Sequence, residues 1–273
     1  MATQPSIPIN PTTHPARHAG KMTEARVTRR FEWWMFLGGM ATASIILCIA
    51  GWVLSLTFGR SFPWESTAAA VAYTLWFVWV VRRDWERLRR ILKGALGERE
   101  VGQILDELRS DGYFAVHGLA IRTPEDGRPV GDIDHVLVGP AGVFVVETKR
   151  LSKNSRGRHP TVTFDGRSVK VDGHVPDRDP IAQARCGAFE VSRMIRAATG
   201  REIWVNAIIV YPGCWVKAPS ELAPDTGVMN PKQLFTWLRR HAKRSQQNRT
   251  LLSPADIILL RHVLLNAASR DEI

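Results

Sequence analysis

The sequence predicts a mixed α/β domain that follows two membrane-spanning helices. Two long apolar runs, at about 33–58 and 62–81, lie in the first third of the chain, and each approaches or exceeds the length of a bilayer span. From residue 96 onward, segments with helical spacing alternate with short apolar strands, as they do in α/β folds. Within that part, the stretch "GDIDHVLVGPAGVFVVETK" (131–149) places charged residues at both ends of an apolar hairpin.

The charge of the chain is unevenly distributed. The 273 residues have a formal net charge of +11 and a pI of about 10.2. Residues 1–96 hold 12 Lys and Arg against 5 Asp and Glu, whereas residues 97–273 hold 25 against 21. Most of the excess therefore lies beside the apolar runs, and the pI alone is weak evidence for nucleic-acid binding. The three cysteines have no spacing that indicates disulfides or a CxxC metal site.

The first apolar run has 26 uncharged residues from Trp33 to Phe58, more than the roughly 20 that cross a bilayer. A signal peptide is the alternative, but this run is too long for one and about thirty residues precede it. The second run has 16 uncharged residues, Ser66–Val81, and reaches 62–81 if Phe62 and Glu65 are included. Because 16 residues is marginal, a buried helix of a soluble protein is the alternative there.

Basic residues predict the orientation of these spans. Ten Lys and Arg flank the two runs on their outer sides, whereas the turn between them has only Arg60. By the positive-inside rule, we expect a multi-pass protein of the inner (plasma) membrane, with both termini and the α/β domain in the cytoplasm. The expected segments are a disordered basic tail (1–30), a transmembrane hairpin (31–82) that contacts the lipid bilayer, and a basic juxtamembrane linker (83–95).

The remaining part has a regular order of expected elements. A helix at 95–110 is followed by the strand "YFAVHGL", the two strands of the quoted hairpin, and a small hairpin "VTF-DG-RSVKV" with Asp-Gly at its turn. A helix from about Pro180 to Thr199 comes next, with proline in its first turn, and "EIWVNAIIVYP" is a strand for a sheet interior. Helices at about 231–243 and 254–268 close the chain.

The quoted hairpin brings four charged residues together. With Gly139–Gly142 as the turn and Val138 opposite Val143, the register places Asp134 opposite Glu147 and Asp132 opposite Lys149. All four then lie on one face, which continues toward the turn, while His135 faces away. The continuing face holds Val136, Val138, Val143 and Val145, and the opposite face holds Ile133, Leu137, Phe144 and Val146.

Three carboxylates and an ammonium group at the end of buried strands are costly unless they are paired or bound to metal. A structural salt-bridge cluster is one interpretation of this pattern. The preferred interpretation is that the cluster binds a hard divalent cation such as Mg²⁺, which needs only one or two carboxylates in addition to water and substrate phosphate.

These residues also carry a family resemblance. "GERE", the quoted hairpin and "DPIAQA" together resemble the nuclease-related domain (NERD) of the PD-(D/E)XK nuclease superfamily, over about Leu96 to Pro212. The resemblance implies a restriction-endonuclease-like αβββαβ core, with a NERD domain at 96–215 and a C-terminal helical extension at 216–273. It also implies catalytic roles for Asp134, Glu147, the motif lysine Lys149, the acidic helix residue Glu98 and the later glutamine Gln183. In this interpretation Asp134 and Glu147 bind Mg²⁺ or Mn²⁺, the Thr148 carbonyl is a possible further ligand, and Asp132 is a less certain additional carboxylate.

Plainer interpretations of the outer residues stay open. Glu98 is also an ordinary first-turn glutamate favoured by the helix dipole, and Gln183 is also a helix-surface glutamine. The loop after Lys149 is a candidate phosphate-contacting segment, or simply a solvated loop. Its basic residues are Arg150, Lys153, Arg156 and Arg158. The histidines show no spacing typical of a zinc site.

Three functions fit these patterns. The first is a membrane-anchored, Mg²⁺-dependent nuclease that hydrolyses phosphodiester bonds in nucleic acid, with DNA favoured over RNA. The second is a catalytically inactive nuclease-fold module that binds nucleic acid or protein at the membrane. The third is a membrane-hairpin scaffold whose soluble part docks partners. The carboxylate cluster favours the first, because a binding module has no need of it.

Overall fold

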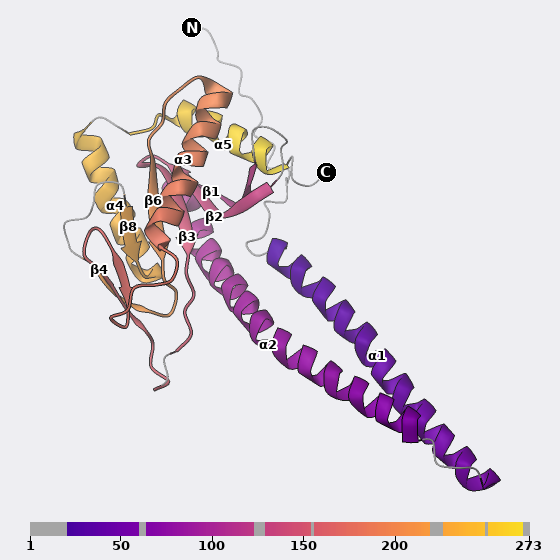
Figure 1. Ribbon diagram of the computed structural model, residues 1–273. Coiled ribbons are helices and arrows are strands. Elements are labelled where there is room, and N and C mark those ends of the chain that lie inside the picture. The colour runs from indigo at the N-terminus through magenta and orange to yellow at the C-terminus, as the bar shows by residue number, and fades with distance from the viewer. Residues whose placement is uncertain are drawn as a thin grey trace. The chain divides into compact units, whose positions relative to one another are not determined.

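The computed structural model describes residues 21–59, 64–122, 129–153, 156–218, 226–248 and 251–269. The chain divides into two compact units, Gly20–Gly97 and Glu98–Ile273 (Figure 1). We describe each unit by itself.

The first unit is a pair of antiparallel helices. It consists of α1 (Lys21–Phe58) and the first part of α2 (Trp64–Glu107). Two contacts at different positions join the helices. Trp52 Nε1 donates a hydrogen bond to Thr67 Oγ1 at 2.8 Å, and the rings of Trp34 and Trp85 lie 6.2 Å apart. Such contacts between facing aromatic and hydroxyl side chains hold the predicted helical hairpin together.

One helix of the described chain is long and apolar enough to cross a membrane, over Phe31–Phe58. Only 6% of its most apolar window is buried, which is unlike the core helix of a soluble protein, although a signal sequence near an N-terminus has the same composition. The second expected span lies in α2, whose uncharged run stops at Arg82. Two membrane spans therefore stay a prediction.

The helices of this unit extend beyond the expected spans. α1 begins at Lys21, so residues 21–30 are helical and do not belong to a disordered tail. Residues 83–95, expected as a linker, are helical as well because α2 continues through them. Both segments are rich in Arg, Glu and Lys, which favour helix, and neither contains proline. Residues 1–20 of the expected tail lie outside the described part of the chain.

The second unit is built on a five-stranded mixed sheet in the order β1-β2-β3-β6-β8. β1 and β2 are antiparallel, as are β2 and β3. β6 runs parallel to β3, and β8 runs parallel to β6. This is the predicted mixed sheet, with β8 as a strand that was not expected. The strands are β1 (Phe114–Arg122), β2 (Pro129–Gly139), β3 (Gly142–Thr148), β6 (Val205–Val210) and β8 (Thr226–Met229).

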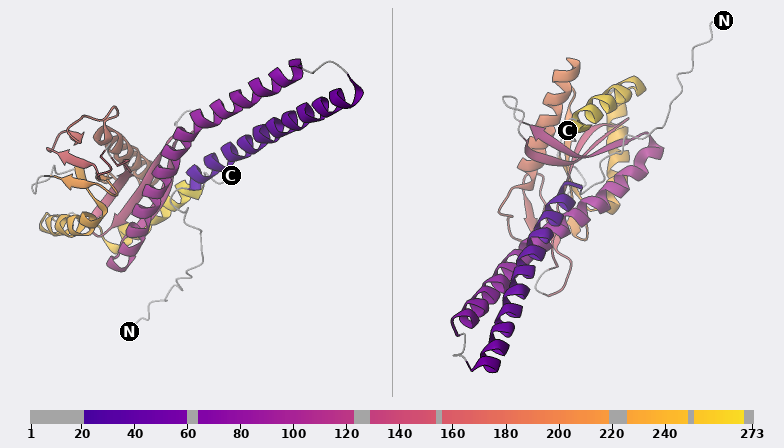
Figure 2. Two further views of the ribbon diagram at one scale, coloured as in Figure 1. Left: turned by 90° about the horizontal axis from the view of Figure 1, so that it is seen from below. Right: turned by 90° about the vertical axis from the view of Figure 1, so that its right-hand side faces the viewer.

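Helices cover both faces of this sheet, as expected for an α/β domain (Figures 1 and 2). On one face, α3 (Pro180–Thr199) and α5 (Pro254–Ser269) pack against the valines of β2 and β3. On the other face, the end of α2, the short 3₁₀ helix Leu108–Asp111 and α4 (Pro231–Gln247) pack around Leu137 and Phe144. Residues 216–273, expected as a helical extension, thus supply β8 to the sheet and a helix to each face.

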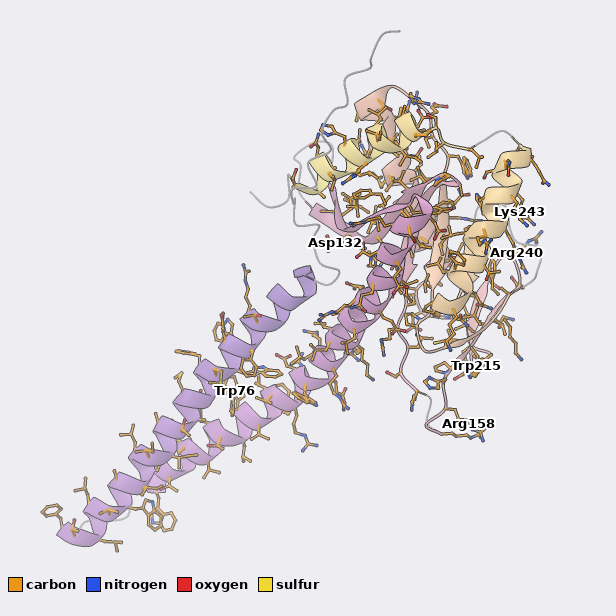
Figure 3. All side chains as sticks on the ribbon, turned by 180° about the vertical axis from the view of Figure 1, so that it is seen from behind. Trp76, Asp132, Arg158, Trp215, Arg240 and Lys243 are labelled. Atoms are coloured by element: carbon orange, nitrogen blue, oxygen red, sulfur yellow. The ribbon has the colours of Figure 1, made fainter. Side chains whose placement is uncertain are left out.

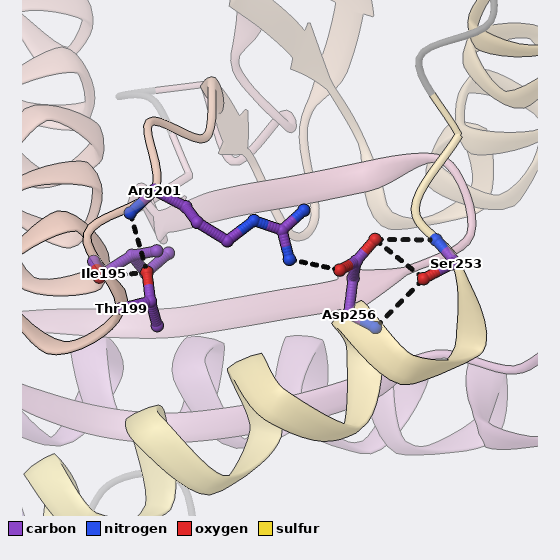
Figure 4. Close-up of polar contacts among 5 residues, drawn as sticks. All are labelled: Ile195, Thr199, Arg201, Ser253 and Asp256. Carbon is purple, nitrogen blue, oxygen red and sulfur yellow. Dashed lines mark hydrogen bonds and ion pairs between the residues drawn. The ribbon is translucent and has the colours of Figure 1, made fainter.

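Local hydrogen bonds define where these helices begin. Asp179 caps α3 by accepting from Ile181 N at 2.8 Å, and proline follows at the first helical position. At the start of α5, Ser253 and Asp256 cap each other, and Arg201 beyond the end of α3 pairs with the same carboxylate (Figure 4). This contact links the end of α3 to the start of α5.

A second, three-stranded sheet lies in the order β5-β4-β7. The predicted Asp-Gly hairpin is confirmed as β4 (Thr161–Phe164) and β5 (Val169–Val171), and Asp165 fixes its loop by accepting from the backbone N of Arg167 and Ser168. The third strand, β7 (Trp215–Lys217), joins β4 in parallel and was not predicted, because three residues show no usable periodicity.

Strict alternation fails at one place in the quoted hairpin. Ile133 was expected on the face of Leu137, but it lies in the same core cluster as Val136 and Val145. The reason is a break in β1 at Gly118, which has a φ of +64° and lies between the pairs His117–His135 and Leu119–Ile133. Side chains beyond this break therefore exchange faces.

Candidate functional site

The predicted register of the quoted hairpin is confirmed. Val138 pairs with Val143 and Gly139 pairs with Gly142, and the ladder continues to the pair of His135 with Val146. Beyond that pair, Asp134 Oδ2 accepts a hydrogen bond from the backbone N of Thr148 at 2.7 Å. This side-chain hydrogen bond replaces a backbone hydrogen bond where the pairing of β2 with β3 ends. It fixes the Asp134 carboxylate near the charge of Glu147.

Three side chains form a triangle at the end of β3. Lys149 Nζ donates to Glu147 Oε1 at 2.7 Å and to Gln183 Oε1 at 2.8 Å, and Gln183 Nε2 donates to the same Glu147 oxygen at 2.6 Å. Glu147 is 5% exposed, whereas the Lys149 side chain is 31% exposed. The glutamine comes from the first turn of α3, whose start is fixed by the Asp179 cap. The structure therefore brings together the predicted glutamate, lysine and glutamine.

The electrostatics of the site are dominated by buried negative charge. Burial raises the pKa of Asp134 well above its ordinary value, and the negative charges of Glu147 and then Glu98 raise it further. The hydrogen bond from Thr148 N and the nearby Lys149 ammonium lower this pKa, but they do not compensate. Glu98 of α2 thus lies within electrostatic range of Asp134 and Glu147.

Two further predicted residues have different positions. Asp132 pairs with Ala120 in the ladder between β1 and β2, and the ladder between β2 and β3 ends at the pair of His135 with Val146. The predicted opposition of Asp132 and Lys149 lies beyond these pairs and stays a prediction. Thr148 is buried, and its Oγ1 atom has no hydrogen-bond partner within the described structure. The backbone of Thr148 is the contact that fixes Asp134.

The basic loop that follows the site is partly engaged by the protein itself. Arg150 Nη1 pairs with Glu100 Oε2 of α2 at 2.7 Å. Lys153, Arg156 and Arg158 are exposed, and Figure 3 shows Arg158 projecting from the domain. Phosphate contact by these four residues stays a prediction.

Comparison with known proteins agrees with this arrangement. Residues 93–212 match the nuclease-related domain, NERD. The matched segment begins in α2 and ends just after β6. It therefore includes every residue of the triangle and the carboxylates of Glu98 and Asp134. An uncharacterized protein of Bacillus anthracis is 40% identical over 57 residues, which is 21% of this chain and 26% of that protein. The chain thus spans about a quarter of the length of that relative. No solved structure matches the chain.

The matched segment also contains one residue near the site that sequence reasoning missed. Tyr211 is buried, and its pKa is raised by burial first and also by the charges of Cys214, Glu147 and Asp179. It directly follows β6, which runs parallel to β3 and pairs Ile209 with Glu147. Because parallel strands end at the same edge of a sheet, a tyrosine after "AIIV" was a signal for this position.

The histidines of β1 and β2 lie away from the triangle, as parity predicted for His135. Nδ1 of His117 and Nδ1 of His135 are 2.8 Å apart, and His117 Nε2 lies 3.4 Å from Asp106 of α2. Burial, together with the neighbouring His117, lowers the pKa of His135 to about 3. His135 is therefore neutral at physiological pH, and the two histidines belong to the α2-facing layer of the core.

The donor atoms at the site suit a hard cation better than zinc. Among the residues that the structure describes, no group of three or more His, Cys, Asp or Glu side chains is arranged to hold a metal ion. An ion here would rest on the carboxylates of Asp134 and Glu147, backbone oxygen at Thr148 and water, which are the ligands that Mg²⁺ accepts. The raised pKa of Asp134 is the observation that fits this ion, because a divalent cation would offset the negative charge.

Proposed function

We propose that this chain is a membrane-anchored nuclease of the PD-(D/E)XK type that hydrolyses phosphodiester bonds in nucleic acid with Mg²⁺ or Mn²⁺. DNA is the favoured substrate. The observation that supports this proposal most is the contact of Lys149 with Glu147 and Gln183 beside an Asp134 whose pKa burial and neighbouring carboxylates raise. A NERD match over residues 93–212 supports the nuclease-like part of the proposal.

The side chains of the triangle have distinct tasks in this proposal. When bound, the divalent ion would lower the pKa of an attacking water and polarise the scissile phosphate. Glu147 and Asp134 hold negative charge in a fixed place, since the first accepts two side-chain hydrogen bonds and the second accepts one from Thr148 N. Lys149 uses two of its three ammonium protons in the triangle, so one stays available to orient water or stabilise charge on a phosphate oxygen.

The membrane part of the proposal rests on the first unit. We propose that α1 and the apolar part of α2 cross the inner membrane as a hairpin, with both termini and the NERD domain on the cytoplasmic side. The exposed apolar surface of Phe31–Phe58 and the ten flanking basic residues support this topology.

The topology predicts the behaviour of reporter fusions. A reporter that is active only in the periplasm should give no signal at the C-terminus of the full chain, because basic flanks retain that end in the cytoplasm. The same reporter inserted at Arg60 should give a strong signal. A strong signal from the C-terminal fusion would contradict the hairpin and would indicate a single span.

A second candidate function is a NERD-fold module that binds nucleic acid or protein without turnover. One observation favours it: Lys149 is already paired with Glu147 at 2.7 Å, as it would be in a structural ion-pair cluster. This candidate predicts binding without cleavage under every metal condition.

A cleavage assay separates the two candidates. Purified full chain in detergent is incubated with plasmid and with single-stranded DNA, in Mg²⁺, in Mn²⁺ and in EDTA. We expect metal-dependent cleavage that Glu147→Gln reduces by at least about 100-fold, since this change removes a charge that the ion requires. Glu190→Gln is the matched control, because Glu190 lies on α3 and pairs with Arg193 outside the triangle. An absence of cleavage on all substrates would leave only the binding module.

A further inference from the structure

The three-stranded sheet has one buried face and one exposed face. Its inner face packs Val162, Phe164 and Val169 into the core of the second unit. On the outer face, cross-strand pairing places Thr163 of β4 between Lys170 of β5 and Lys217 of β7, and places Thr161 next to Trp215. The Trp215 ring is 68% exposed although tryptophan is usually well covered. Figure 3 shows it at the surface, at the same end of the domain as Arg158.

The surroundings of this face are basic. Residues 150–178 hold seven Lys and Arg against three Asp, and Lys217 of β7 adds an eighth cation. His159 Nδ1 lies 2.6 Å from the carbonyl O of Gly213, so the end of the basic loop is tied to the turn that precedes Trp215. Of the three aspartates, Asp165 and Asp172 accept hydrogen bonds from backbone N–H groups. Lysines and arginines therefore dominate the charge that a ligand on this face would meet.

A cavity lies directly beside the Trp215 ring. Its volume is about 310 Å³, at the lower end of the range for small-ligand pockets. His159, Trp215 and Lys232 line it together with Asn230 and Glu100. An aromatic wall, amide and imidazole groups, and a cation are the combination that accepts a planar base attached to a phosphate.

The exposed face is connected to the candidate site through two strands. β4 begins 12 residues after Lys149, and β7 begins five residues after Val210, which pairs with Thr148. Both segments leave the edge of the main sheet at which Glu147 and Lys149 lie. Two short segments therefore join the small sheet to that edge.

We propose that the outer face of β5-β4-β7 binds a single-stranded stretch of nucleic acid, with a base stacked on Trp215 and phosphates at Lys170 and Lys217. A single strand exposes the faces of its bases, whereas a duplex stacks them internally, so an exposed tryptophan selects the single strand. This inference rests on the proposed function and names its substrate class as single-stranded or locally unpaired nucleic acid.

Binding of labelled oligonucleotides tests the inference without cleavage. The full chain in detergent, with EDTA present, is titrated into a fluorescein-labelled 20-nucleotide oligo-dT and into a duplex of equal length, and anisotropy is measured. We expect tighter binding of the single strand. Trp215→Ala should weaken that binding by roughly five- to tenfold, and Trp215→Phe should retain most of it because the stacking surface persists.

The control is a second exposed tryptophan. Trp204 is 72% exposed and lies just before the first residue of β6, whereas the candidate site lies at the other end of that strand. Trp204→Ala therefore removes a similar aromatic surface far from the site. Lys170→Ala with Lys217→Ala should reduce the salt slope of binding by about 1.4, from about 0.7 per phosphate on a single strand. Lys243→Ala, about 18 Å along α4 from the Pro231 that lines the cavity, is the lysine control.

The outcomes separate this inference from the proposed function. Unchanged binding by Trp215→Ala, equal loss with Trp204→Ala, or equal loss for duplex and single strand would each overturn it. If Trp215→Ala lowers the thermal transition, the binding affinity of Trp215→Phe for the single strand decides the outcome. Complete loss of binding in a folded phenylalanine variant would also contradict stacking. A protein that binds oligo-dT through Trp215 but never cleaves would refute the nuclease and leave this inference intact. Cleavage with Trp215-independent binding would refute this inference alone.

Discussion

Two polar clusters of the second unit have similar components and opposite electrostatics. At the end of β3, Lys149 pairs with Glu147, and burial together with the charges of Glu147 and Glu98 raises the pKa of Asp134 well above its ordinary value. At the start of α5, the Asp256 carboxylate accepts hydrogen bonds from both Arg201 and Ser253, and these bonds lower its pKa to about 2 (Figure 4). Ion pairs that only hold a fold together favour the charged form of the acid. A raised pKa of a carboxyl group instead means that its surroundings disfavour the charged form, which is common at functional sites.

The largest effect should come from removal of the cation in the first cluster. Lys149→Met takes away the only ammonium among the contacts of Glu147 and leaves that buried carboxylate with Gln183 alone. We expect cleavage to fall by at least about 100-fold and the free energy of unfolding to fall by about 2 kcal/mol, since a buried charge loses its partner. Cleavage assays and urea denaturation check the two effects. An unchanged activity would remove Lys149 from the site.

The opposite sign is expected when a carboxylate of the same cluster is neutralised. Because the pKa of folded Asp134 lies above its unfolded value, its contribution to stability is present below about pH 3.8 and is lost as the pH rises through the folded pKa. Asp134→Asn should therefore stabilise the metal-free protein by about 1 kcal/mol at neutral pH, with no gain in acid. Urea denaturation of both proteins in EDTA, at pH 3.5 and pH 7.5, measures this. A destabilised variant at neutral pH would mean that Asp134 is held charged by a structural pair.

The smallest effect belongs to the second cluster. The pKa of Asp256 is lowered by its Arg201 and Ser253 hydrogen bonds, so its contribution is present above about pH 3.8 and lost as the pH falls toward 2. Asp256→Asn should lower the Tm slightly at neutral pH, because the Arg201 side chain is 50% exposed and solvent therefore screens the pair. It should leave cleavage and the response to Mg²⁺ unchanged. A changed Mg²⁺ response would remove the distinction between the two clusters.

The part of the site that the sequence predicts well depends on local geometry. A glycine turn and two apolar alternating strands determine the pairing of Val138 with Val143, and that register brings Asp134 to Glu147. Pro180 likewise predicts the start of α3, which the Asp179 cap fixes in the structure, and thus the first-turn position of Gln183. That Gln183 reaches Glu147 depends on how α3 packs on β3, which only the fold determines.

The parts that escaped prediction depend on long-range contacts. β7 and β8 have three and four residues, so they are defined by the strands they join and not by a pattern of their own. Ile133 lies on the other face next to Gly118, whose φ of +64° belongs to the neighbouring strand β1 and is not visible in the pattern of the hairpin itself. Tyr211 escaped because its proximity to Glu147 arises from the parallel pairing of β3 with β6, across more than sixty residues of sequence.

A thermal melt of the parent protein and of Glu147→Gln, each with and without Mg²⁺, tests the central claim most directly. If the first cluster is a metal site, Mg²⁺ should raise the Tm of the parent but not of the variant. Without Mg²⁺, the variant should be at least as stable as the parent, because one of the crowded carboxylates is neutral. If the cluster is a structural ion-pair network, Lys149 loses its charged partner and the variant should be less stable by about 3 kcal/mol. That loss, together with a parent Tm that Mg²⁺ does not change, would contradict the account.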